Sequence, residues 1–133
     1  MRKLTAYVIS PVLFLSFSSV CKSADTESEI IGYLEGATLN NTLTVTRASM
    51  DSDGYIVLYT RRDGYWSFSI SSVDLSQADL GLTTRIECRS GECVTHTTSS
   101  GRQFKDTDLK VRPPNYRDGD RLFQAMSRLQ GSQ

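Results

Sequence analysis

Residues 42–71 alternate apolar and polar side chains, and this alternation constrains the fold more than any other feature of the chain. It runs through three segments, 42–48, 55–61 and 65–71, which predicts three half-buried β-strands. Asp63-Gly64 separates the last two segments and is a strong signal for a tight hairpin turn. We therefore expect an antiparallel meander in the middle of the chain.

The two later strands of this meander differ in their faces. In the segment 65–71, Trp66, Phe68 and Ile70 alternate with serines, which predicts one buried and one exposed face. The segment 55–61 carries apolar residues on both faces, which predicts a central strand.

Further strands are expected beyond the meander, at about 82–89, 92–98, 102–105 and 109–111. Residues 73–80 are interpreted as a connection with one helical turn.

A helix is expected at each end of this sheet. A capping-box sequence and an apolar stripe predict a helix at Glu27–Leu39, ended by Asn40-Asn41. A second apolar stripe predicts a helix at Asp120–Leu129. The expected fold class is α+β and mainly β: an antiparallel curved sheet or partly open barrel of five to seven strands, flanked by an N-terminal and a C-terminal helix. In layout, a meandering sheet closed by a C-terminal helix is similar to pleckstrin-homology-like domains, and this resemblance implies no site residue.

The first residues of the chain differ from the rest. Arg2 and Lys3 precede an almost entirely apolar run over residues 4–17, and small residues follow it. This order is typical of a secretory signal peptide. We predict a signal peptide at residues 1–23 and a single exported β-rich domain at residues 24–133. The alternatives are a retained anchor, a buried N-terminal helix, or a lipoprotein signal in which Cys21 is lipidated.

Charge argues against nucleic acid as a partner. The whole chain has 15 basic and 15 acidic residues. The predicted signal peptide contains Arg2, Lys3 and Lys22 and no acid, so the exported part has 12 basic groups and a net charge near −3. Because phosphate binding requires clustered Lys and Arg, we expect no nucleic-acid partner.

Cys88 and Cys93 are the cysteines that remain after the predicted cleavage, and two cysteines in an exported chain predict one disulfide. The intervening Ser90-Gly91 predicts a two-residue hairpin turn in which Arg89 faces Glu92. The cysteines would then be a non-hydrogen-bonded pair with Cα atoms about 4.5 Å apart. The bridge would fix the local register only. Redox chemistry and a zinc site that also uses His96 are the alternatives.

Catalytic chemistry has little support in the sequence. His96 is the only histidine, and it lies among threonines in a predicted strand. A small hydrolase would have to use this histidine or a pair of carboxylates, and no nucleophile-elbow motif is present. There is also no phosphate-binding or dinucleotide-binding motif. We therefore expect no enzyme activity, no cofactor and no metal.

Aromatic and basic residues gather around the predicted hairpin at Asp63-Gly64. Tyr, Trp and Arg are frequent anchors of protein interfaces. Trp66 is expected in the core, so the candidate contact residues for a protein partner are Tyr59, Arg61, Arg62 and Tyr65.

The function predicted from these observations is a small exported binding module without enzymatic activity. Its location is predicted to be periplasmic or secreted, with no membrane span after processing. An inhibitor or immunity-type protein of the cell envelope is one concrete form. The alternatives are a structural subunit of an envelope or secretion assembly and a small hydrolase using His96. The oligomeric state is left open.

Overall fold

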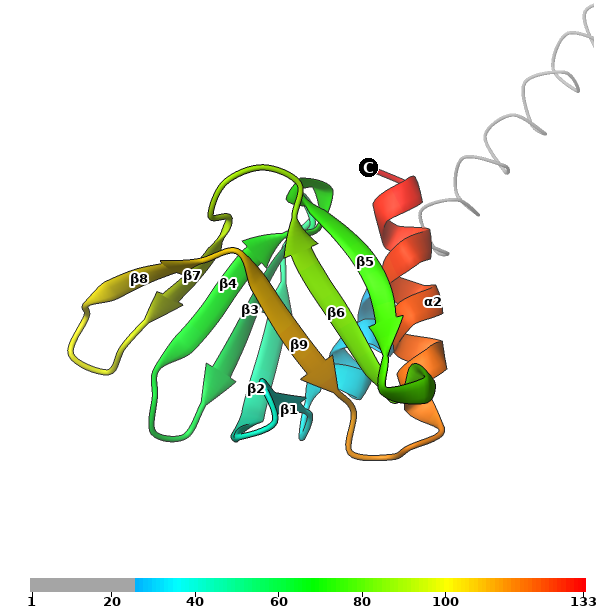
Figure 1. Ribbon diagram of the computed structural model, residues 1–133, viewed down its shortest axis with the longest axis horizontal. Helices are drawn as coiled ribbons and strands as arrows, with labels where there is room; N and C mark the ends of the chain where they lie inside the picture. Colours follow the sequence, from blue (N-terminus) through cyan, green and yellow to red (C-terminus); the bar gives the residue numbers. More distant parts are fainter. Residues whose placement is uncertain (1–25) are drawn as a thin grey trace, which may run out of the picture.

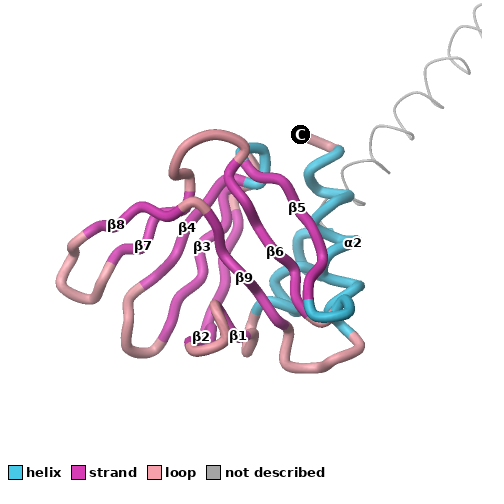
Figure 2. Tube along the Cα trace, in the orientation of Figure 1, coloured by secondary structure: helices cyan, strands magenta, loops and turns pink. Residues whose placement is uncertain are grey.

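The computed structural model describes residues 26–133, in which nine antiparallel strands form one open sheet with a helix at each end of the chain (Figures 1 and 2). The predicted signal peptide and Cys21 lie outside these residues. Within them, α1 covers residues 26–34, and α2 is Asp118–Gly131. The strands are β1 (Thr38–Leu39), β2 (Leu43–Met50), β3 (Tyr55–Thr60), β4 (Tyr65–Ser69), β5 (Val73–Ala78), β6 (Thr83–Cys88), β7 (Val94–Thr97), β8 (Gln103–Asp106) and β9 (Asp108–Arg112).

The order of the strands in the sheet is β5-β6-β9-β1-β2-β3-β4-β7-β8. The mainly β class and the helix at each end are confirmed. The strand count of five to seven is wrong, because β1 and β5 lie in segments for which no strand was expected.

The predicted helix at Glu27–Leu39 is too long at its C-terminal end. The helix stops at residue 34, and Gly36 follows with φ of +85°, which carries the chain out of the helical path. Leu39 then pairs with Leu43 of β2 and Val111 of β9. Asn40-Asn41, expected to end the helix, instead forms the turn between β1 and β2 with φ of 49° and 65°.

The expected connection at residues 73–80 is mostly a strand. β5 pairs with β6 along its whole length, from Val73 opposite Cys88 to Ala78 opposite Thr83. Val73 is buried and Leu75 is half-buried, whereas Asp74 is exposed. This alternation is that of a β-strand. Asp, Ser, Gln and Ala have low strand propensity, so pairing with β6 is what stabilises the strand.

The core lies on one face of the sheet. The predicted C-terminal helix is confirmed, and α2 packs against β5 and β6. An ion pair of 2.9 Å between Glu29 of α1 and Arg128 of α2 joins the two helices. The Gln130 side-chain amide donates hydrogen bonds to the carbonyl oxygens of Ile70 and Val73. The largest fully buried side chains come from both helices and from the sheet: Ile30, Leu34, Leu39, Val45, Ile56, Leu58, Phe68, Ile70, Ile86, Leu109, Leu122 and Met126.

β2 joins the two halves of the sheet, because it pairs with β1 on one side and with β3 on the other. Its first two residues pair with β1, and residues from Val45 onward pair with β3. The register shifts between Val45 and Arg47, so Thr46 is an extra, exposed residue. A bulge bends its strand and increases the local twist. Before the bulge, at Leu43 and Thr44, β2 therefore has no pairing with β3.

Candidate functional site

The turn between β3 and β4, residues 61–64, is called the hairpin tip here. Arg61, Arg62 and Asp63 are exposed, and Gly64 has φ of +78°. The Thr60 hydroxyl donates to the Gly64 carbonyl oxygen at 3.0 Å and accepts from the Asp63 backbone N–H at 3.2 Å. These bonds close the tip at its base.

The β7–β8 hairpin holds the tip from the side. His96 Nε2 donates a hydrogen bond to the Asp63 carbonyl oxygen, and the Ser99 hydroxyl donates to the Arg62 carbonyl oxygen at 2.9 Å. A Cβ atom at Gly64 would lie 1.9 Å from the Thr97 carbonyl oxygen, so only glycine fits there. The tip is therefore rigid, although two arginine side chains project from it.

A cavity of about 400 Å³ lies beside the tip, between the start of β2 and the end of β3. Thr46, the extra residue of the β2 bulge, is one of the residues that line it. We call it the tip pocket. Its lining residues are Thr42, Leu43, Thr44, Thr46, Thr60, Arg61, Arg62 and Asp63.

The polar groups of the tip pocket fall into two sets. The hydroxyl of Thr46 donates to the Tyr59 carbonyl oxygen at 3.2 Å, and that of Thr60 is bonded within the tip. By contrast, the described part of the chain offers no hydrogen bond or ion pair to the side chains of Thr42, Thr44, Arg61 and Arg62. Hydroxyl and guanidinium groups that face a cavity in this state are available to a ligand.

The four predicted contact residues divide between two places. Arg61 and Arg62 line the tip pocket, but Tyr59 and Tyr65 do not. The two tyrosine rings lie 5.6 Å apart on the sheet face opposite the core, and Arg47 lies 4.3 Å from the centre of the Tyr59 ring. The tyrosines therefore form a half-buried cluster on the outer face, next to the tip but separate from the pocket.

The pocket threonines were not expected as site residues. The alternation in residues 42–48 predicts only a half-buried strand, in which Thr42, Thr44 and Thr46 are polar side chains. The available signal was the proximity of three alternating hydroxyls to a turn that carries two arginines. It could not be used because the pairing of β2 with β3 and its bulge are tertiary features.

His96 has a structural environment. Its ring stacks on Trp66 at 4.0 Å between centroids, with the planes within 1° of parallel, and it also approaches Phe104 at 6.3 Å. Trp66 is 7% exposed, as expected for a core residue, and its Nε1 has no hydrogen-bond partner in residues 26–133. The described contacts of His96 are the rings of Trp66 and Phe104 and the carbonyl oxygen of Asp63. It therefore connects the buried Trp66 to the backbone of the hairpin tip.

The Cys88–Cys93 disulfide is present, with Cα atoms 5.6 Å apart, but the expected hairpin around it is wrong. β6 pairs with β5 and β9, whereas β7 pairs with β4 and β8. Arg89 forms its ion pair with Asp74 at 3.1 Å, and not with Glu92. A two-residue turn sequence predicted local pairing, but each strand found a different partner.

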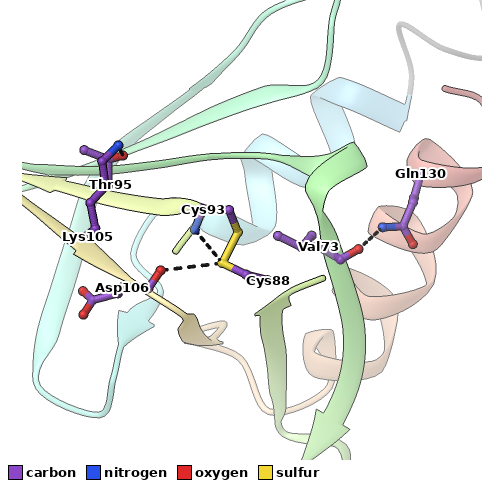
Figure 3. Close-up of a disulfide and its surroundings, with 7 residues drawn as sticks. All are labelled: Val73, Cys88, Cys93, Thr95, Lys105, Asp106 and Gln130. Atoms are coloured by element: carbon purple, nitrogen blue, oxygen red, sulfur yellow. Dashed lines mark hydrogen bonds between the residues drawn. A yellow bond between two sulfur atoms is a disulfide. The ribbon is translucent and has the colours of Figure 1, made fainter. Parts of the chain in front are cut away.

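The surroundings of the disulfide explain its position (Figure 3). The Cys93 backbone N–H donates to Cys88 Sγ at 2.9 Å, and that sulfur lies 3.6 Å from the Asp106 carbonyl oxygen. The Cys88 backbone N–H donates to the Thr107 carbonyl oxygen at 2.8 Å, at the point where β8 leads into β9. The bridge therefore lies where the chain crosses twice between the two ends of the sheet.

A second turn, between β5 and β6, presents an unusual residue. Leu80 is fully exposed and has φ of 60°, a left-handed conformation that leucine seldom adopts. Asp79 accepts hydrogen bonds from the Thr83 hydroxyl and from Arg112, both at 2.9 Å. These bonds, with the Thr83 bond as the larger cause, hold the pKa of Asp79 below its ordinary value.

No group of three or more His, Cys, Asp or Glu side chains is placed to hold a metal ion within residues 26–133. Over the same range, neither helix combines the length and apolar character that a membrane crossing requires. Comparison of the sequence with protein-family models and with curated proteins found no match.

Proposed function

We propose that this chain is an exported binding module without enzymatic activity, and that it engages a protein partner through the hairpin tip and the tip pocket. One observation carries the proposal. A turn held by backbone hydrogen bonds presents Arg61 and Arg62 at the rim of a cavity, and neither guanidinium group has a hydrogen-bond or ion-pair partner among the described residues. Arginine is favoured at the centre of protein interfaces.

The chemistry of the pocket favours an acidic group on the partner. Guanidinium groups bind carboxylates through paired, charge-assisted hydrogen bonds. The hydroxyls of Thr42 and Thr44 can donate further hydrogen bonds to the same oxygens. An Asp or Glu side chain, or a C-terminal carboxylate, would suit this arrangement.

Rigidity of the tip supports binding by insertion. Bonds from His96 and Ser99 already fix the backbone carbonyls of Asp63 and Arg62. Binding then requires little additional ordering of the backbone, which lowers the entropic cost of association. An inhibitor or immunity-type protein, acting in the periplasm or after secretion, is the form of the proposal that fits a small exported domain.

Two other functions remain alternatives to this proposal. A structural subunit of an envelope or secretion assembly would also present a rigid contact surface. A small hydrolase using His96 is less favoured, because Nε2 of that histidine is engaged with a backbone carbonyl and its ring is stacked on Trp66.

Partner capture with matched variants tests the proposal. The purified protein and its Arg61→Ala/Arg62→Ala variant are each immobilised and exposed to periplasmic extract. The expected result is a protein retained by the wild type and lost by the double variant, with binding weakened by added salt. Arg121→Ala removes an exposed arginine from α2 and is the control that should retain the protein. Equal retention by both arginine variants would contradict the proposal.

A further inference from the structure

The outer edge of β8 is the feature that carries an inference beyond the proposed function. β8 is the last strand in the sheet order, and no described strand pairs with its outer side. Gln103, Phe104 and Lys105 are exposed, and Phe104 is 47% exposed. Figure 1 shows this strand on the side of the molecule away from α2. An uncovered edge of this kind offers a row of backbone donors and acceptors to another strand.

The ladder with β7 shows which backbone groups face outward. The Thr98 N–H donates to the Arg102 carbonyl oxygen at 2.8 Å, so residues 98 and 102 form a hydrogen-bonded pair. Antiparallel pairs alternate between hydrogen-bonded and non-hydrogen-bonded, so Phe104 is hydrogen-bonded to β7 and its two neighbours are not. Gln103 and Lys105 therefore direct their N–H and C=O groups away from the sheet.

The side chains next to this edge share one face and carry opposite charges at its two ends. Alternation places Arg102, Phe104 and Asp106 on the same side of the strand as the core. The Arg102 guanidinium lies 5.4 Å from the centre of the Phe104 ring. Phe104 is the outermost of three neighbouring rings, since Trp66 stacks on His96 and His96 approaches Phe104. No ion pair joins either Arg102 or Asp106 to another residue of the range 26–133.

We infer that the β8 edge binds a second copy of this chain, in an antiparallel pairing with Phe104 on the twofold axis. In that register, Gln103 of each copy lies opposite Lys105 of the other copy. These are the residues whose N–H and C=O groups face outward, so they form hydrogen-bonded pairs on both sides of the axis. The two Phe104 rings then meet at a non-hydrogen-bonded position, where side chains approach most closely.

Charge selects this register among those that the backbone permits. Centring the pairing on Phe104 places Arg102 of each copy opposite Asp106 of the other, which gives an attractive pair at each end. Centring it on Gln103 or on Lys105 also matches the outward groups, but places Phe104 opposite a charged residue. The edge is thus complementary to itself, as a closed twofold interface requires.

A charge-exchange experiment tests this inference. Sedimentation equilibrium should show that the wild type is a reversible dimer. Arg102→Asp and Asp106→Arg each replace the attractive pairs by repulsive ones, and each should raise the dimer Kd about tenfold. The combined Arg102→Asp/Asp106→Arg variant restores opposite charges and should return the Kd to near the wild-type value. Recovery by the double variant cannot be explained by a general loss of folding.

Controls separate this edge from other surfaces. Phe104→Ala should weaken the dimer, whereas Tyr116→Ala, which removes a 70% exposed ring outside the sheet, should not. Hydrogen exchange of the Gln103 and Lys105 amides should slow as protein concentration rises. A monomer at every concentration, a dimer unaffected by the single charge reversals, or a double variant that fails to recover would each overturn the inference. The Arg61→Ala/Arg62→Ala variant should dimerise normally, which keeps this test independent of the proposed partner site.

Discussion

Cys88 and Cys93 are five residues apart, and their disulfide connects strands near opposite ends of the sheet. Cys88 ends β6, which is second from one end of the strand order, and Cys93 precedes β7, which is second from the other. The short bridge therefore ties the β4–β7–β8 part of the sheet to the part that packs on α2. Its role extends beyond the local register that the sequence predicted.

Removal of this disulfide should weaken the attachment of the β7–β8 hairpin. The Cys88→Ser/Cys93→Ser variant should lose about 2 kcal/mol of unfolding free energy, the chain-entropy contribution of so short a closed loop. Urea denaturation measures this loss. Amide exchange should accelerate more in β7 than in β5, because the disulfide connects the residue before β7 to the end of β6. Equal acceleration in both strands would contradict the role inferred from the topology.

Gly64→Ala should be strongly destabilising. Alanine would adopt a left-handed φ and would also place its Cβ 1.9 Å from the Thr97 carbonyl oxygen. Gly91→Ala is the matched control, since Gly91 also has positive φ but its Cβ would meet nothing within 4 Å. The control should lose about 1 kcal/mol from backbone strain alone. Thermal or urea unfolding should show a clearly larger loss for Gly64→Ala, and equal losses would show that the hairpin tip is not held as described.

Asp79 should make stability depend on pH in the acidic range. Hydrogen bonds from Thr83 and Arg112 lower its folded-state pKa below the ordinary value of 3.8. A lowered folded pKa stabilises the protein above the unfolded-state pKa, and this contribution is lost as pH falls through the folded-state value. The stability difference between wild type and Asp79→Asn should therefore be largest near neutral pH and shrink below about pH 4. A constant difference from pH 7 to pH 2 would contradict this assignment.

Leu80→Asn should stabilise the protein. Leu80 has positive φ and is fully exposed, so its replacement loses no burial and relieves an unfavourable backbone conformation. Because asparagine tolerates the left-handed region, we expect a gain of about 0.5 kcal/mol in unfolding free energy. Leu80→Ile keeps an apolar side chain but adds a β-branch, and it should lower stability. Urea denaturation of the two variants checks both signs.

Local signals in the sequence were sufficient for much of the fold. The alternation in residues 42–48 and 65–71, the Asp63-Gly64 turn and the apolar stripe of α2 all predicted the elements that are present. The burial of Trp66 was predicted from the same alternation. Each of these features depends on side chains close together in the chain, whose spacing reflects the period of a strand or a helix.

The candidate site was only partly accessible to this reasoning. The sequence predicts Arg61 and Arg62 as contact residues because they lie beside a recognisable turn. Thr42 and Thr44 line the same pocket but come from another strand, so no local pattern pointed to them. The same limit explains the error at Cys88–Cys93. Ser90-Gly91 permits a hairpin, but β5 and β9 occupy the two edges of β6, so neither edge is left for β7.

The sequence by itself determined the main structural elements: the strands of the central meander, the presence of the two helices, the hairpin tip and the two cysteines that bond. Tertiary structure decided which strands are neighbours, that Val73–Ala78 and Thr38–Leu39 are strands at all, and that the threonines at the start of β2 and two arginines line one pocket. The physical reason is that the free energy of strand pairing comes from contacts between residues far apart in the chain, and no local pattern specifies those partners.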